Sequence, residues 1–479
     1  MATPETRSAA RPRPLEPDPE ALRRLTDETV AFVLEHIATL ASQPSFDLDG
    51  AAEVADSFRE PAPETGRPLG EILTRLKPAI AKSFNTAGPG YLAFIPGGGI
   101  PSAALADFIA CGVNRYVGVT APAPALARIE GSAIDWLCAA MGYPAGAGGI
   151  LTSGGSLSNL TAVVTARTAK LPENFLGGTL YMSEETHLCA LKAARIAGFP
   201  ERNVRRLPVD ARFRLVPEAL ERAIAEDRAR GLEPFFVVAN VGTTNTGAID
   251  PLADILAIAR REDLWVHADG AYGGFFRLVP GGEALMRGVE ECDSITLDPH
   301  KGLFLPYGTG ALLVRDPDAL RRAHEGEAHY LQDVAAGAGQ VSFHEISPEL
   351  SRDFRGLRVW LPIMLHGLAA FREQLVEKLA LARWAYERLR DEPLFEILDE
   401  PQLSVVAFRT RPPGGEADAF GEELLRRVNA RRRVFLSSTR LGGRYVLRIC
   451  VLSFRTHEDR VREAVEALVE EAGAMARGR

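Results

Sequence analysis

The chain has 479 residues, of which 46% are apolar and 25% are charged. These fractions are typical of globular proteins and exclude a disordered, fibrous or disulfide-scaffold chain, while the length fits about three compact units of roughly 150 residues. The 55 basic and 63 acidic side chains give a net charge of −8, which argues against a nucleic-acid binder and against a polybasic membrane association.

The first 19 residues are rich in proline, arginine and glutamate and lack the apolar segment of a secretory signal. We therefore expect residues 1–19 to form a flexible arm and the protein to be cytoplasmic. The longest apolar runs, such as 235–239, are far shorter than the roughly 20 residues that span a bilayer, so no membrane association is expected. The five cysteines contain no Cys-x-x-Cys pair and the histidines show no metal-ligand spacing, so we predict reduced thiols and no metal site.

A helical and irregular segment is predicted for residues 20–125. Asp18 can cap its first helix, in which apolar residues recur at helical spacing. Glycine and proline are frequent between residues 61 and 124, which indicates an irregular path. Two further helices are expected in this segment, at about 67–82 and 101–112.

A large α/β domain is predicted for residues 126–392, because short apolar runs alternate there with helical stretches, as in βαβ units around a largely parallel sheet. The predicted strands are 179–183, 204–207, 235–240, 264–269, 293–297 and 310–315. The predicted helices between them are 156–169, 187–198, 217–229 and 251–261. The chain is then mainly helical, with a mobile loop expected at about 330–350, where small residues pack poorly.

A small α+β domain is predicted for residues 393–479. Its expected elements are a strand at 402–409, a helix at 416–430, strands at 433–438 and 443–453, and a helix at 456–472. The chain as a whole is therefore expected to be an α/β protein with an appended α+β domain.

Four sites at strand ends or helix starts carry polar residues, where open α/β sheets place their ligands. At 152–159 a glycine-rich turn opens a helix whose first N–H groups can hold a phosphate, although a capped helix after a tight turn fits the same pattern. Asp269 ends a buried strand and needs a partner for its charge. His300 and Lys301 end another strand, although a lysine is more often a solvated residue. His187 follows a strand, where it can also serve simply as a helix cap.

Together these sites provide what pyridoxal 5′-phosphate requires: a phosphate cradle, a carboxylate for the pyridine nitrogen, an imidazole and a lysine that forms a Schiff base. The chain resembles the group II pyridoxal-phosphate-dependent decarboxylases, the family of the aromatic-L-amino-acid and glutamate decarboxylases. The segments that carry the resemblance are 152–160, 186–198, 241–244, 267–274 and 298–302. The resemblance implies the aspartate-aminotransferase-like fold (fold type I) and a homodimer that shares its active site, clasped by the N-terminal segment.

The resemblance also implies a role for each matching residue. Lys301 would form the internal aldimine, Asp269 would pair with the pyridine nitrogen, and His187 would stack on the cofactor ring. Ala271 would pack on the opposite face of the ring, and His300 would lie beside the lysine.

The cofactor's phosphate would be held by Gly155 and Ser156. One threonine of the pair 243–244, for which we choose Thr243, would bond the ring substituent or the carboxylate. The implied activity is decarboxylation of an L-amino acid to the amine and CO2, through an external aldimine and a quinonoid.

The family's mobile loop carries a tyrosine, supplied across the dimer, that is thought to protonate Cα after CO2 leaves. Counting back from Ser351, the matching position here is Phe343, followed by His344. Phenylalanine has no proton to give, whereas a histidine with the ordinary pKa of about 6.5 has one near neutral pH. Two outcomes stay open: a decarboxylase in which His344 or a neighbouring group donates the proton, or an aldehyde synthase that releases an aldehyde, ammonia and peroxide.

The substrate pocket is expected to include Phe94 and Phe343 and to be wider than in relatives, which carry bulkier residues at the positions of the glycines 97–99. A site for an acidic amino acid would present a cation to the distal carboxylate. The segment 85–120 offers no such cation except Arg115, for which we expect a structural role, so we favour an aromatic substrate such as tryptophan, tyrosine or phenylalanine. An acidic amino acid, a carbon–carbon lyase activity and a catalytically silent protein of the same fold stay as alternatives.

Overall fold

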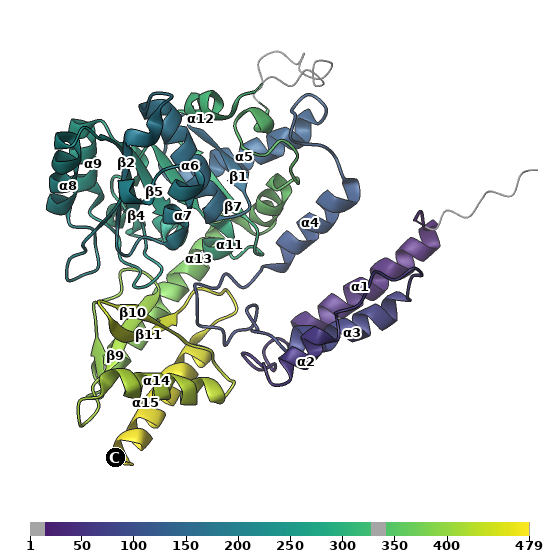
Figure 1. Cartoon of the computed structure of the whole chain (residues 1–479). Helices are drawn as coiled ribbons and strands as arrows, with labels where there is room; N and C mark the ends of the chain where they lie inside the picture. The colour runs from purple at the N-terminus through teal and green to yellow at the C-terminus, as the bar shows by residue number, and fades with distance from the viewer. Residues whose placement is uncertain (1–14, 327–341, 479) are drawn as a thin grey trace, which may run out of the picture. The chain divides into compact units, whose positions relative to one another are not determined.

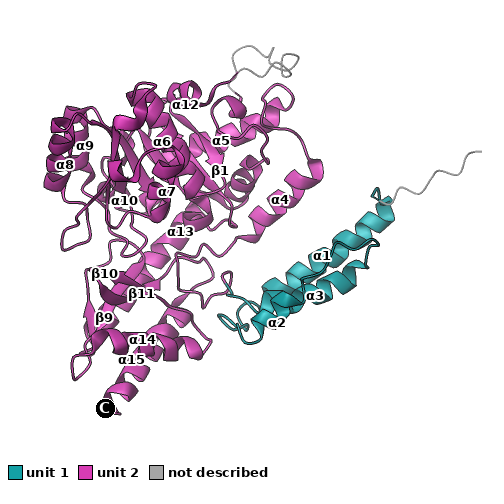
Figure 2. Ribbon diagram, in the orientation of Figure 1, with its two compact units in different colours: residues 1–85 teal, residues 86–479 magenta. Residues whose placement is uncertain are grey.

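The computed structural model describes residues 15–326 and 342–478. The chain forms two compact units, residues 1–85 and residues 86–479, which Figure 2 distinguishes by colour. Most of the predicted arm lies outside the described residues, as does the part of the predicted loop between 327 and 341.

The first unit consists of helices. These are α1 (Pro19–Thr39), α2 (Ala51–Asp56) and α3 (Leu69–Ala81). Asp18 caps α1 as predicted, because its carboxylate accepts a hydrogen bond from the N–H of Ala21 at 2.7 Å. Helices α1 and α3 contact each other, so the unit is held by packing between its helices.

A seven-stranded sheet forms the centre of the second unit (Figure 1). Its strands are β1 (Gly148–Thr152), β2 (Gly178–Ser183), β3 (Val204–Leu207), β4 (Glu233–Asn240), β5 (Trp265–Gly270), β6 (Ser294–Leu297) and β7 (Gly310–Val314). In space they follow the order β1-β7-β6-β5-β4-β2-β3, and β7 runs antiparallel to both of its neighbours while the other pairs are parallel. The predicted, largely parallel sheet is therefore confirmed, with β1 as a strand that the prediction did not include.

Helices occur before, between and after these strands, and several of them pack on the sheet. They are α4 (Pro101–Val113), α5 (Pro124–Ala140), α6 (Gly155–Lys170), α7 (Leu188–Ile196), α8 (Pro217–Ala229), α9 (Leu252–Glu262), α10 (Gly282–Leu285), α11 (Pro299–Gly302), α12 (Pro317–His324) and α13 (Gly356–Arg390). Helix α6 packs on β4 to β7, and α8 and α9 pack on β4. Strands β2, β5 and β7 are buried at every residue, as expected of strands in a sheet covered by helices on both faces.

The C-terminal part of this unit carries a second, four-stranded antiparallel sheet in the order β10-β11-β9-β8. Its elements are β8 (Phe395–Ile397), β9 (Val405–Thr410), α14 (Ala417–Ala430), β10 (Ser437–Leu441), β11 (Arg444–Cys450) and α15 (Glu458–Arg477). The predicted small α+β portion is thus present, with its own apolar core. Both sheets lie in one compact unit, so the predicted boundaries at residues 125 and 392 stay predictions.

Several buried strands end at the same edge of the large sheet. Strand β4 ends at Asn240, β5 ends just after Asp269, and β6 is followed directly by Asp298. Polar side chains that are far apart in the sequence therefore meet at this edge. Among the helices of residues 15–326 and 342–478, none is long and apolar enough to cross a bilayer.

Candidate active site

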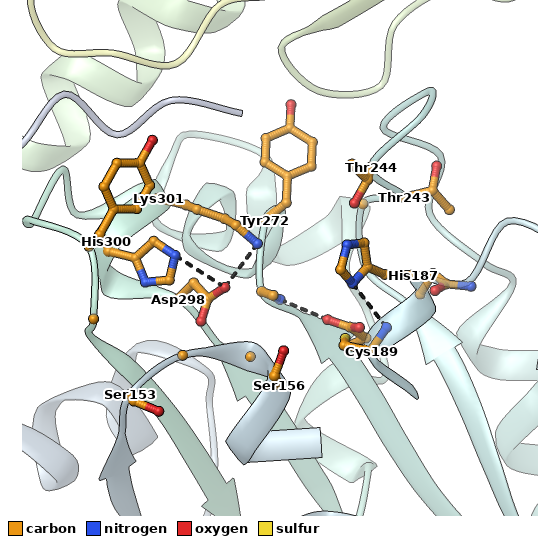
Figure 3. A pocket seen from close by; sticks show the side chains of 18 residues that line it. Ser153, Ser156, His187, Cys189, Thr243, Thr244, Tyr272, Asp298, His300 and Lys301 are labelled. Carbon is orange, nitrogen blue, oxygen red and sulfur yellow. Dashed lines mark hydrogen bonds and ion pairs between the residues drawn. The ribbon is translucent and has the colours of Figure 1, made fainter. Parts of the chain in front are cut away.

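The strand ends of the large sheet enclose a cavity of about 340 Å³ (Figure 3). Its lining residues are Ser153, Gly154, Gly155, Ser156, His187, Cys189, Asn240, Gly242, Thr243, Thr244, Asp269, Ala271, Tyr272, Asp298, His300, Lys301, Tyr307 and Gly308. They come mainly from the segments that follow β1, β2, β4, β5 and β6, which is where an open α/β sheet binds its ligands.

Lys301 lies on the short helix α11, directly after β6. Its Nζ atom is 2.9 Å from Oδ2 of Asp298, and Figure 3 shows this ion pair inside the cavity. Burial on its own would lower the pKa of Lys301, but the carboxylates of Asp298 and Asp269 raise that pKa above its ordinary value. The amine is therefore held as an ammonium at a fixed place in the cavity.

Asp269 lies near the end of β5 and is buried, with 7% of its surface exposed. Its Oδ1 atom accepts a hydrogen bond from the N–H of Ala271 at 3.2 Å. Burial raises the pKa of Asp269, and the positive charge of Lys301 opposes this rise. A carboxylate buried in this way is stabilised by a cation brought into the cavity.

His187 precedes α7, and its Nδ1 atom accepts a hydrogen bond from the N–H of Cys189 at 3.3 Å. Burial lowers the pKa of His187, so the ring is neutral and carries its proton on Nε2. Figure 3 shows the ring in the cavity, on the side of Thr243 and Thr244. A flat, uncharged ring in this place is suited to stacking on a planar ligand.

The glycine-rich turn after β1 leads into α6, which begins at Gly155. Gly154 has φ 146° and ψ 176°, a backbone region that is essentially open only to glycine. A side chain at Gly155 would lie 3.2 Å from Oδ2 of Asp298 and 3.5 Å from Cβ of Ala271, so the glycine keeps this part of the cavity open. The first N–H groups of a helix have no partner within the helix, and its positive end attracts phosphate.

Thr243 and His300 also line the cavity. The Thr243 hydroxyl lies 2.9 Å from the hydroxyl of Thr246, a contact within its own turn. The Nδ1 atom of His300 donates a hydrogen bond to the carbonyl of Thr309 over 2.6 Å, and burial lowers the pKa of the ring. His300 is therefore fixed beside Lys301 as a neutral imidazole.

The cavity thus brings together the residues predicted for the cofactor site. They are Gly155, Ser156, His187, Thr243, Asp269, Ala271, His300 and Lys301. Their individual roles stay predictions.

Three further predicted residues lie elsewhere in this chain. Phe94 is 57% exposed. Phe343 is buried in the 3₁₀ helix η6 (Phe343–Glu345), where it lines a different cavity and lies 5.0 Å from the guanidinium of Arg352. The Nδ1 atom of His344 is 3.3 Å from the carbonyl of Gly118. Among the described residues, the lining of the Lys301 cavity does not include these three, so a role for them at the site stays a prediction.

Two of the glycines 97–99 lie where the backbone passes close to other atoms. A side chain at Gly97 would overlap the backbone carbonyl of His300, and a side chain at Gly98 would lie 2.5 Å from the Ser453 hydroxyl. Close approach therefore accounts for glycine at these two positions, and the expected shape of the substrate pocket stays a prediction.

Sequence reasoning gave no role to several polar residues of the cavity, among them Asp298 and Tyr307. Asp298 could have been noticed, because it follows a buried strand and directly precedes the short helix that carries Lys301. Tyr307 carries no such signal, since only the fold turns its segment back toward the lysine.

These residues fit pyridoxal 5′-phosphate on grounds of their own chemistry. The buried carboxylate of Asp269 suits a protonated ring nitrogen, and Lys301 offers an amine to an aldehyde. The turn at Gly155 suits the phosphate because a side chain there would fill the space.

Comparison with known proteins agrees with this fit. A family model described as the pyridoxal-dependent decarboxylase conserved domain matches residues 53–411. The aromatic-L-amino-acid decarboxylase of Bacillus atrophaeus is 34% identical over 461 residues, which cover 94% of this chain and 96% of that protein.

Solved structures give the same result. The structure of Oryza sativa TDC with PLP and tryptamine matches with a TM-score of 0.91 and 28% identity, over 97% of this chain and 99% of that one. The 4-hydroxyphenylacetaldehyde synthase of Rhodiola rosea matches with a TM-score of 0.88 and 25% identity, over 96% and 99%. The predicted family resemblance, the fold type I architecture and the predicted cofactor are confirmed.

Proposed function

Because the chain belongs to the pyridoxal-dependent decarboxylase family, we propose that it removes the α-carboxyl group of an aromatic L-amino acid as CO2 and releases the amine. The observation that carries this proposal is one cavity that holds Lys301, Asp269 and the glycine-rich turn at Gly155. Each of these supplies a different contact that the cofactor needs.

When bound, the cofactor supplies an electron-withdrawing ring that accepts the negative charge left at Cα as CO2 departs. Lys301 would hold the cofactor through its amine, which the cavity places beside Asp298. Asp269 keeps a proton on the ring nitrogen, because its buried carboxylate is most stable beside a positive charge. His187 would stack on the ring, with Ala271 on the opposite side, and the N–H groups of Gly155 and Ser156 would hold the phosphate.

The lining of the cavity favours an aromatic substrate over an acidic one. Lys301 is the one lysine or arginine among the described lining residues, and it is already paired with Asp298. A distal carboxylate would therefore find no free guanidinium there. The rings of Tyr272 and Tyr307, in contrast, offer flat surfaces to an aromatic side chain.

The test is an incubation of the purified enzyme with L-tryptophan, L-tyrosine, L-phenylalanine and L-glutamate, in which amine, CO2, aldehyde and peroxide are measured together. We expect one amine per CO2 from at least one aromatic substrate and no turnover of glutamate. Peroxide equal to CO2 would instead identify an aldehyde synthase, the activity that the Rhodiola rosea protein is named for. No CO2 from any of the four would refute the proposal.

His344 is the proposed donor of the proton that replaces CO2 at Cα, with Phe343 beside it at the substrate. Because His344 lies outside the Lys301 cavity of its own chain, this role requires that a second copy supplies the residue. The His344→Ala variant should then give less amine per CO2 in the same assay. An unchanged amine yield would exclude His344 as the donor.

A homodimer is proposed as the active form, supported by an exposed apolar surface on two helices that contact each other, α4 and α13. Its exposed side chains are Leu105, Phe108, Ile109, Met364 and Leu365. A surface of this kind marks a protein interface, and a second copy would also bring in Phe343 and His344.

Light scattering should give twice the mass of one chain, and the Phe108→Asp substitution should reduce the measured mass to that of a monomer. A wild-type monomer with full activity would contradict this proposal.

The proposed location is the cytoplasm. All five cysteines are free thiols, which suits a reducing compartment. Fractionation of cells that make the protein should place the decarboxylase activity in the cytosolic fraction, and activity confined to another fraction would refute this assignment.

A further inference from the structure

The cavity contains a second buried carboxylate, Asp298, which forms the ion pair with Lys301. Only 2% of its surface is exposed. Its Oδ2 atom lies 2.9 Å from Nζ of Lys301 and 3.6 Å from Nε2 of His300, and both contacts are drawn in Figure 3. Its Oδ1 atom is buried without a hydrogen-bond partner among the described residues. Placing a carboxylate in this way is costly unless a cation stays beside it.

Among the groups that surround Lys301, Asp298 is the charged group in direct contact with its amine. The titratable groups that face the lysine are Asp298, Asp269, His187, His300, Cys189 and Tyr307. Burial lowers the pKa of both histidines and raises the pKa of the thiol and of the phenol, so these four groups are uncharged near neutral pH. Of the two carboxylates, Asp298 is the one within hydrogen-bond distance of Nζ.

We propose that Asp298 is a positioning residue for Lys301, which holds the free side chain as an ammonium in one place whenever the lysine is not covalently bound to the cofactor. This inference rests on the proposed function and concerns two moments: before the cofactor attaches, and after the amino group of the substrate has displaced the lysine. A lysine side chain has four flexible carbon–carbon bonds, so without a partner its amine would be dispersed over the cavity.

The ion pair with Asp298 affects the reaction by which Lys301 attaches to the cofactor. A C=N bond forms between Nζ and the aldehyde carbon, and the aldehyde oxygen leaves as water with two of the three ammonium protons, so one proton and the positive charge stay on nitrogen. Bond formation needs the unprotonated amine. A negative charge 2.9 Å away stabilises the ammonium and therefore raises the pH at which attachment reaches half of its maximal rate.

The experiment compares the wild type with Asp298→Asn, which has nearly the same shape but no charge. Pyridoxal 5′-phosphate is added to the cofactor-free full chain, and the imine absorbance is followed over pH values on both sides of the ordinary lysine pKa of about 10.4. We expect the pH midpoint of the attachment rate to fall by about one pH unit or more in the variant, which raises the fraction of unprotonated amine at neutral pH about tenfold. The maximal rate at high pH should also be lower in the variant, because the amine is no longer held in place.

Asp293→Asn is the matched control. Asp293 is also a partly buried carboxylate next to β6, but it precedes the strand and accepts a hydrogen bond from the N–H of Val266 at 2.7 Å. The pH midpoint of the attachment rate in Asp293→Asn should equal that of the wild type. Pyridoxal without the phosphate serves as a second probe, because Asp298 also lies beside Gly155 in the phosphate cradle. A midpoint shift that appears only with the phosphorylated probe would overturn the proposal.

The outcomes separate this proposal from the proposed function. If pyridoxal 5′-phosphate fails to attach to the wild type, the proposed function fails. If it attaches with the same midpoint in wild type and Asp298→Asn, only the role of Asp298 fails. Should the variant not fold, competitive acetylation of the cofactor-free wild type decides: Lys301 should react with a higher pH midpoint than the exposed Lys192, and an equal or lower midpoint would overturn the proposal.

Discussion

The Lys301→Ala variant is expected to lose decarboxylation by about ten thousandfold or more, because the described lining residues of the cavity include no other amine that can attach the cofactor. The cofactor itself should still bind, since the turn at Gly155 and the carboxylate of Asp269 remain in place. The measurement is CO2 release together with the absorbance and the cofactor content of the purified variant. We expect cofactor to be present without the imine band.

Lys192→Ala is the control for this substitution, because Lys192 is an exposed lysine on α7. Its activity should equal that of the wild type. If Lys301→Ala kept more than a few per cent of the activity, Lys301 would not be the residue that carries the cofactor.

The Asp269→Asn variant should keep the covalent attachment of the cofactor but decarboxylate about a thousandfold more slowly. Asparagine fills the same space and can still accept the hydrogen bond from Ala271, yet it has no charge with which to keep the ring nitrogen protonated. Without that proton the ring accepts negative charge from Cα poorly, so the step that releases CO2 slows down. Single-turnover measurements of CO2 release give this rate apart from cofactor binding.

Asp293→Asn again provides the comparison, because it removes a partly buried carboxylate outside the cavity lining. It should decarboxylate at the wild-type rate. Equal rates in the wild type and in Asp269→Asn would refute the electronic role of this carboxylate.

The sequence was informative where local patterns determine the structure. The apolar run that became β4 and the acidic end of β5 have a clear strand pattern bounded by polar residues. Parallel strands bring their carboxyl ends to one edge of the sheet, so the sequence alone predicts that Asp269 and Lys301 belong to one site. Strand β1 was missed because it begins with Gly148 and Gly149, which weaken a strand pattern.

The sequence was less informative where distant segments meet. The glycine at position 97 is needed because the backbone of His300 lies against it, a contact across some two hundred residues of chain. The distance of 2.9 Å between Asp298 and Lys301 depends on the geometry of a four-residue helix. His344 was assigned by its position relative to a family motif, and that position does not reveal which cavity its ring reaches.

The claim that Lys301 carries the cofactor is tested most directly by identifying the labelled residue. The wild-type protein is incubated with pyridoxal 5′-phosphate, reduced with borohydride and digested, and the peptides are analysed by mass spectrometry. We expect the imine band to disappear on reduction and one pyridoxyl group to be found per chain, on Lys301. A label on any other lysine, or no label at all, would contradict it.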